Sequence, residues 1–106
     1  MSASPTFAHY PIADSIRHLP AQPAKPYFIE FSKGTLELGL YAPRGVDPQS
    51  PHTRDEFYVV AAGQGEFVAG NERTTFGPGD ALFVAAGVVH RFENFSDDLV
   101  VWVIFA

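Results

Sequence analysis

The sequence contains no cysteine. This absence excludes disulfide bonds, thiolate zinc sites, iron–sulfur clusters and cysteine nucleophiles. Basic residues are also scarce, because 7 lysines and arginines stand against 12 aspartates and glutamates and leave a net charge of −5. A basic surface for nucleic acid and a polybasic membrane tether both require the opposite balance. We therefore expect no nucleic-acid partner and no membrane partner.

Long hydrophobic runs are missing as well. No apolar stretch approaches the roughly 20 residues that a membrane-spanning helix needs. The N-terminal residues MSASPTFAHYPIAD contain no basic segment followed by an apolar block, so no secretory signal is predicted and a cytoplasmic location is expected. What the chain does have is 106 residues of which 46% are hydrophobic, which is enough for one packed core.

Prolines gather at the beginning of the chain. The first 26 residues hold five of the nine prolines. Because proline lacks an amide donor and fixes its own φ angle, no long helix or strand is expected there. One short helical turn is predicted within Ile12–Leu19, from its apolar spacing. We interpret residues 1–26 as an N-terminal arm laid over a single domain that spans residues 27–106.

From residue 27 onward, the pattern is one of short strands separated by glycine and proline turns. The expected strands are Tyr27–Ser32, Thr35–Tyr41, Glu56–Ala62, Glu66–Ala69, Glu72–Phe76, Ala81–Ala85, Val88–Phe92 and Leu99–Phe105. Short strands at such close and regular spacing are typical of an antiparallel sandwich or barrel. The sequence therefore predicts an all-β fold.

The segment Leu99–Ala106 is apolar at every position, without alternation. A strand of this kind needs cover on both faces, because an uncovered apolar strand is a site of aggregation. The barrel and the arm could supply that cover, or a second subunit could. We expect a homodimer.

Two of the four histidines are candidates for chemistry. His52 precedes Glu56 by four residues, and on a straight strand the two would lie about 13 Å apart, too far to share a metal ion. The polar residues 53–55 can make a bend, so that His52 ends one strand, Glu56 begins the next and the two side chains converge. His90 follows an apolar stretch, and taken alone it is as readily a half-buried strand residue bonded to a carbonyl group.

Two segments resemble the motifs of the cupin superfamily, the small metal-binding β-barrels. The first cupin motif reads Gly, five residues, His-x-His, three or four residues, Glu, six residues, Gly. Residues 45–63 are similar to it: Glu56 and Gly63 fall in place, and His52 matches the second histidine. Ser50 stands where that motif has its first histidine, and the opening glycine lies one place late.

The second cupin motif reads Gly, five residues, Pro-x-Gly, two residues, His, three residues, Asn. Residues 79–94 are similar to it, with Ala85 in place of the proline. The positions that match are Gly79, Gly87, His90 and Asn94. The resemblance covers residues 27–105 and implies a cupin-type antiparallel β-barrel, jelly-roll-like, behind the N-terminal proline-rich arm.

The resemblance also implies a metal site. His52, Glu56 and His90 match three of the family's four usual ligands, and Ser50, a poor ligand for a transition metal, replaces the fourth. Two histidines and a carboxylate can form a facial triad with open positions, as in non-haem Fe(II) sites. A divalent transition metal is therefore expected, and Fe, Mn, Zn and Ni all suit these three groups.

Strand alternation adds candidates for a substrate pocket. Tyr58 lies on the same face of its strand as Glu56, and Phe92 on the same face as His90. Together with Ser50 they are expected to line a mostly apolar pocket for a small-molecule ligand. Tyr58 and Phe92 could equally be plain core residues.

Three functions remain open at this point. The resemblance implies a small metalloenzyme or metal-dependent binding protein, with dioxygenase-like or isomerase-like chemistry on an organic ligand. A metal-free module that binds a small molecule or a sugar is the alternative. An interaction domain with a vestigial pocket is the third, and the missing first histidine is its main support.

Overall fold

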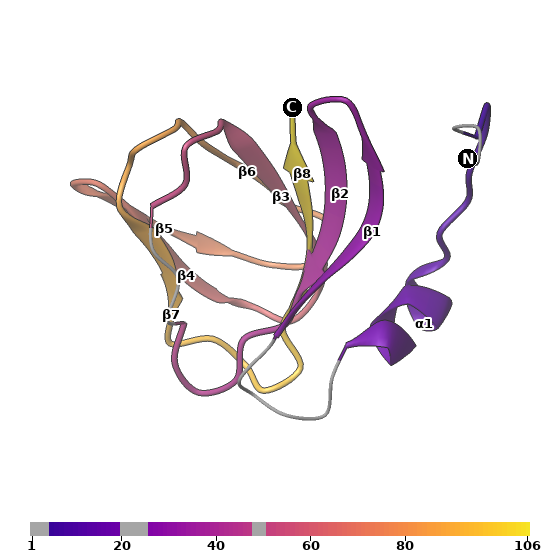
Figure 1. The fold of residues 1–106 in the computed structure, drawn as a ribbon. Coiled ribbons are helices and arrows are strands. Elements are labelled where there is room, and N and C mark those ends of the chain that lie inside the picture. The colour runs from indigo at the N-terminus through magenta and orange to yellow at the C-terminus, as the bar shows by residue number, and fades with distance from the viewer. Residues whose placement is uncertain (1–4, 20–25, 48–50) are drawn as a thin grey trace.

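The computed structural model describes residues 5–19, 26–47 and 51–106, and there the chain is built mostly of antiparallel strands (Figure 1). The strands are β1 (Tyr27–Lys33), β2 (Leu36–Tyr41), β3 (Glu56–Ala62), β4 (Gly65–Ala69), β5 (Glu72–Phe76), β6 (Ala81–Val84), β7 (His90–Glu93) and β8 (Val100–Phe105). They form a five-stranded sheet in the order β1-β2-β8-β3-β6 and a three-stranded sheet in the order β5-β4-β7. The expected all-β fold of antiparallel strands is confirmed. No helix within the described ranges is long and apolar enough to cross a membrane.

The eight strands lie where the sequence predicts them, with small differences at their ends. The largest is at β7, which begins at His90 rather than at Val88. The preceding residues instead form a turn, in which the Val88 amide donates to the Ala85 carbonyl and Gly87 has a φ of 81°. A positive φ of this kind favours glycine. Because Gly87 forms a turn here, the strand begins after the turn, at His90.

The core lies between the two sheets and is rich in aromatic rings. Its centre is a group of rings in contact, with Phe92 4.9 Å from Phe67 and 5.0 Å from Tyr58 between ring centroids. Alternate residues of β8 complete it, because Val101, Val103 and Phe105 point inward. Burial of these side chains stabilises the barrel by roughly 1.5–3 kcal/mol each.

The described part of the arm, residues 5–19, lies over part of the outer face of the large sheet. It contains the helical turn α1 (Ile12–Ser15), which continues into a 3₁₀ turn, η1 (Ile16–His18), as predicted. The His18 ring lies 4.8 Å from that of Phe28, and Leu19 packs on an outer cluster that includes Leu40 and Trp102. The large sheet is therefore covered on both faces where the arm crosses it (Figure 1).

A buried carboxylate joins the two sheets near the loop that carries His52. Asp47 is 7% exposed and accepts two hydrogen bonds, one from the Tyr41 hydroxyl on β2 and one of 2.8 Å from the Phe92 amide on β7. Burial, and then the hydrogen bond to Asp47, raises the pKa of the Tyr41 phenol well above its ordinary value. The loop after β2 is thus tied to both walls of the barrel.

Replacement of Asp47 by alanine would leave a buried hydroxyl and a buried amide without their acceptor. We expect Asp47→Ala to lower the free energy of unfolding by about 1–3 kcal/mol, as measured by urea denaturation. Asp14→Asn is the matched control, since Asp14 is exposed on α1 and makes only a local pair with Arg17. Equal stability of the two variants would contradict this role for Asp47.

Candidate metal centre

The chain bends between His52 and Glu56, as their convergence requires. Residues 53 and 54 form the bend, and Glu56 is the first residue of β3. One expectation is wrong, since His52 ends no strand and lies in an irregular segment. Pro51, just before it, has no amide to donate to a strand ladder.

Two hydrogen bonds hold this bend against the turn before β7. The Gly87 amide donates to the His52 carbonyl at 2.8 Å, and the Ala86 amide donates to Asp55 Oδ1 at 2.8 Å. Asp55 therefore serves the bend itself, while its neighbour Glu56 turns inward. These bonds place the two cupin-like segments side by side.

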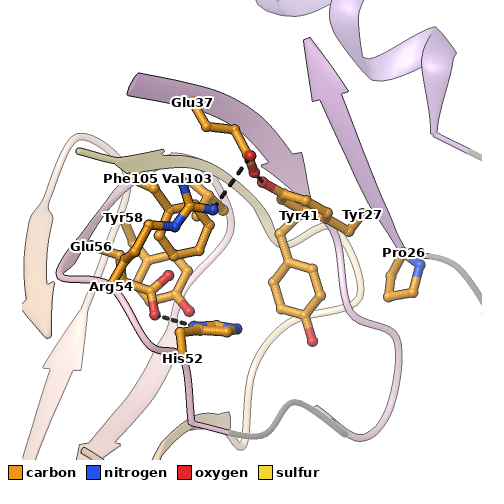
Figure 2. Close-up of a pocket in the computed structure, with 10 residues that line it drawn as sticks. All are labelled: Pro26, Tyr27, Glu37, Tyr41, His52, Arg54, Glu56, Tyr58, Val103 and Phe105. Atoms are coloured by element: carbon orange, nitrogen blue, oxygen red, sulfur yellow. Dashed lines mark hydrogen bonds and ion pairs between the residues drawn. The ribbon is translucent and has the colours of Figure 1, made fainter. Parts of the chain in front are cut away.

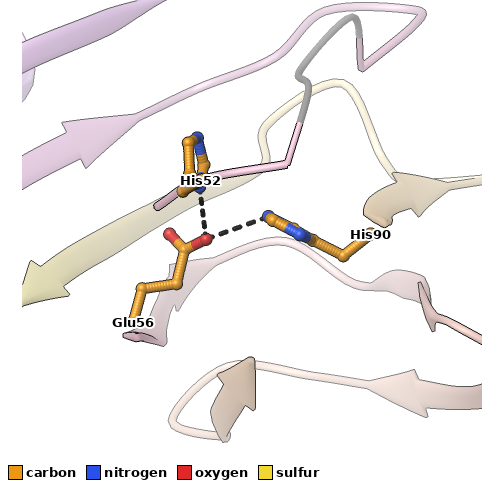
Figure 3. Close-up of side chains that lie close together, drawn as sticks. All are labelled: His52, Glu56 and His90. Atoms are coloured by element: carbon orange, nitrogen blue, oxygen red, sulfur yellow. Dashed lines mark hydrogen bonds and ion pairs between the residues drawn. The ribbon is translucent and has the colours of Figure 1, made fainter. Parts of the chain in front are cut away.

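His52, Glu56 and His90 point toward one another (Figure 3). Glu56 Oε1 lies 2.5 Å from His52 Nδ1 and 2.9 Å from His90 Nε2. Glu56 is 2% and His90 is 3% exposed, whereas the His52 side chain is about one third exposed. One potential ligand atom from each residue lies within 4.8 Å of the other two. The group is therefore closed on the core side and open toward solvent at His52.

Charge in this group is shared between the carboxylate and the imidazoles. Burial alone would raise the pKa of Glu56, but the hydrogen bonds from His90 and His52 outweigh it and lower that pKa. Burial alone would lower the pKa of His90, but its bonds to Glu56 and to the Val88 carbonyl outweigh burial and raise it. The contact between Glu56 and His90 therefore favours the charged form of both side chains.

The same residues fit a divalent metal ion. His90 Nδ1 lies 2.8 Å from the Val88 carbonyl, which fixes the proton there and leaves the Nε2 lone pair of the neutral ring directed at the group. Glu56 Oε2 is buried and has no hydrogen-bond partner among the described residues. Two imidazole nitrogens and a carboxylate with an unpaired oxygen form a donor set for Zn, Fe, Mn or Ni.

A cavity of about 450 Å³ opens beside the group (Figure 2). Tyr58 lines it, whereas Phe92 lies in the aromatic core and is not among the lining residues. Ser50 lies outside the described residues.

The hydroxyl of Tyr58 is 3.0 Å from His90 Nε2. Burial, and then the charge of Glu56, raises the pKa of Tyr58 well above its ordinary value, so this phenol stays protonated. The cavity is lined by Pro26, Tyr27, Glu37, Tyr41, His52, Arg54, Glu56, Tyr58, Val103 and Phe105.

Seven of the ten cavity residues were not predicted from the sequence, and three of the seven, Tyr27, Glu37 and Arg54, interact with one another. Glu37 Oε2 accepts a 2.8 Å hydrogen bond from the Tyr27 hydroxyl, and Glu37 Oε1 lies 3.4 Å from Arg54 Nη2. The Tyr27 ring can lie across β2 because Gly39 has no side chain, since a Cβ there would come within 2.3 Å of the Tyr27 hydroxyl oxygen. The alternation Glu37-Gly39-Tyr41 was the available signal, because these three share one face of β2.

Comparisons with known proteins agree with the fold. A family model described as the cupin domain matches residues 38–105. The Streptomyces coelicolor protein SCO3923 is 40% identical over 73 residues, which cover 67% of this chain and 70% of that protein.

Two solved structures illustrate the likeness. A cupin-2 domain protein from Shewanella frigidimarina superposes with a TM-score of 0.73 at 16% identity, over 90% of this chain and 91% of its own. The DMSP lyase DddQ from Ruegeria pomeroyi superposes with a TM-score of 0.66 at 23% identity, over 83% of this chain and 50% of its own. Likeness at this level of identity establishes a shared fold.

The ion pair at Glu56 can be tested in the metal-free protein. We expect Glu56→Gln to lower the pKa of His90, because the variant removes the negative charge that favours imidazolium. The measurement is an NMR pH titration of the His90 ring. Glu66→Gln is the control, since Glu66 pairs with Arg73 on the other sheet. An unchanged His90 pKa in Glu56→Gln would refute the pairing.

Proposed function

Since the chain belongs to the cupin family, we propose that it holds a divalent transition metal on His52, Glu56 and His90 and binds a small organic ligand in the adjoining cavity. The observation that carries this proposal is the convergence of the three side chains, with ligand atoms within 4.8 Å of one another. Their two nitrogens and one carboxylate match the facial triad, in which the remaining positions accept water or substrate.

The residues around the group have separate tasks in this proposal. Val88 orients His90 through its carbonyl, and Asp55 and Gly87 hold the bend that carries His52. Val103 and Phe105 form an apolar wall that limits the access of water to the ligand. When bound, the metal supplies Lewis acidity that polarises an oxygen atom of the ligand.

Proton transfer is the chemistry that the cavity favours. Glu56 is engaged by the two histidines, but Glu37 lines the same cavity as a second carboxylate. Glu37 is therefore in position to take a proton from a ligand and return it, as isomerase-like chemistry requires. The facial triad also suits dioxygenase-like chemistry, but Glu37 adds support for proton transfer alone.

The alternative function is a metal-free module that binds a small molecule or a sugar. It has one observation in its favour, because Glu56 Oε1 lies within hydrogen-bond distance of a nitrogen atom of each imidazole. A site of this kind would keep its ion pair and use the cavity only for binding. Metal uptake separates the two functions.

We expect the purified protein, after metal supplementation, to retain about one metal ion per chain, and His52→Ala and His90→Ala each to retain less than about 0.1. Elemental analysis after gel filtration measures this. His9→Ala is the matched control, because His9 is exposed in the arm.

The pH dependence gives a second check of the same proposal. Metal binding requires neutral imidazoles, and the pKa of His90 is raised. Protons therefore compete with the metal, and retention should be high at pH 8 and fall as pH drops to about 6 and below. A wild-type protein that takes up no metal at pH 8, or one that keeps its metal unchanged at pH 5, would contradict histidine ligation.

We also propose that the chain forms a homodimer through the outer face of the large sheet. Phe57 on β3 and Phe83 on the edge strand β6 face outward, with rings 5.2 Å apart and exposed fractions of 47% and 54%. Leu36 on β2 is exposed to 47% as well. Large apolar side chains exposed on one sheet face are typical of a contact with another subunit.

Light scattering on a sizing column tests the dimer. We expect the wild-type protein to have twice the chain mass of 11.6 kDa, and Phe83→Glu to shift it to the monomer, because a charge would be buried at the contact. Val46→Glu is the control, since Val46 is exposed to 75% outside this sheet face. A monomeric wild-type protein would end the proposal.

A further inference from the structure

We propose that Arg54 is the anion-binding residue of the cavity, and that the ligand is a small carboxylic acid with a second oxygen donor on a neighbouring carbon. The second donor is assigned to the open positions of the metal, so the inference rests on the proposed function in that respect. The carboxylate itself is assigned to Arg54. Arg54 lies in the bend between His52 and Glu56, and its side chain reaches the wall of the cavity (Figure 2).

One aromatic ring fixes the guanidinium group beside the metal ligands. Arg54 Cζ lies 4.4 Å from the centroid of the Phe105 ring, and the His52 ring meets Phe105 edge to face at 5.3 Å. The N–H donors of a guanidinium group lie in the plane of the group. An aromatic ring against one face therefore leaves these donors available for a ligand. A ligand of a few carbon atoms can therefore touch Arg54 and the group at His52 at once.

The hydrogen bonds of Arg54 within the protein are long. Its donors reach Glu37 Oε1 and the Thr35 carbonyl, both at 3.4 Å. Charge-assisted bonds from arginine to a carboxylate normally measure about 2.7–2.9 Å, and a guanidinium offers five donors. A ligand carboxylate can thus make shorter, bidentate bonds. The Arg54 side chain is 39% exposed, so the ligand can reach it.

The charges in the cavity favour a single negative charge on the ligand. Arg54 is the one lysine or arginine among the lining residues, all of which lie in the described ranges. A divalent ion and Arg54 would together carry three positive charges, against the two negative charges of Glu37 and Glu56. One ligand carboxylate would balance the remaining positive charge. The apolar wall formed by Val103 and Phe105 lowers the local dielectric constant and strengthens that pairing.

The competing explanation is that Arg54 and Glu37 form an ordinary ion pair with no ligand. A partly exposed pair of this kind contributes little to stability. The two explanations differ in what the cavity selects. If Arg54 binds an anion, a carboxylic acid must bind better than its neutral amide, and this preference must depend on Arg54.

The experiment uses lactate and lactamide, which have nearly the same shape and differ in charge, with ligand-observed NMR on the Zn²⁺-loaded protein. We expect lactamide to bind at least about tenfold more weakly than lactate, and Arg54→Gln to raise the Kd of lactate about tenfold without changing that of lactamide. Zinc content should stay at the wild-type level in Arg54→Gln, because Arg54 is not part of the donor group.

Two further variants keep the result interpretable. Arg54→Met retains apolar packing on Phe105 and removes the charge, so it should show the same loss if Arg54→Gln folds poorly. Arg73→Gln removes a more exposed arginine on β5, whose side chain is 49% exposed, and should leave the Kd of lactate unchanged. Thermal unfolding confirms that each variant is folded.

The outcomes separate this inference from the proposed function. Equal Kd values for lactate in wild-type protein and folded Arg54 variants, equal binding of lactate and lactamide, or no lactate binding in either metal-loaded or metal-free protein would overturn the role of Arg54. A protein that takes up no zinc, yet binds lactate in an Arg54-dependent way, would refute the metal site and leave the anion-binding role standing.

Discussion

The buried carboxylate of Glu56 is the constraint around which this site is arranged. A charge that is almost fully withdrawn from solvent is costly unless nearby groups compensate it. His52 and His90 compensate one of its oxygens, and they come from segments far apart in the sequence. The chain must therefore bring the bend before β3 and the turn before β7 to the same place, and the amides of Ala86 and Gly87 secure that meeting.

Much of the fold follows from local patterns. Glycine and proline turns separate the strands in the sequence as they do in the structure, because these residues interrupt a ladder wherever they occur. The bend between His52 and Glu56 could also be inferred, since a straight strand would hold the two side chains apart. Gly63 shows why a motif position tolerates little change: its φ is 94°, and a Cβ there would lie 2.6 Å from Leu99 Cα.

The rest of the site depends on which face of each strand turns inward. Strand β2 shows why local sequence patterns did not identify that face. Its leucines suggest a buried face, yet Leu40 is covered from outside by the arm, while Glu37 and Tyr41 face the cavity. Alternation identifies two faces but not the side on which the barrel closes. Phe92 illustrates the same limit. It was expected at the cavity because it shares a strand face with His90, but its side chain lies in the core.

Strand β8 lies between β2 and β3 and is hydrogen-bonded to both, whereas β2 and β3 do not pair with each other. During synthesis, one edge of β2 and one edge of β3 therefore stay unpaired until β8, the last strand of the sheet, has been made. Long-range pairing of this kind is slow and leaves nascent chains exposed to association with one another. Phe105, which supports both His52 and Arg54, arrives with the same strand. The large sheet therefore closes, and the site forms, in the same folding step.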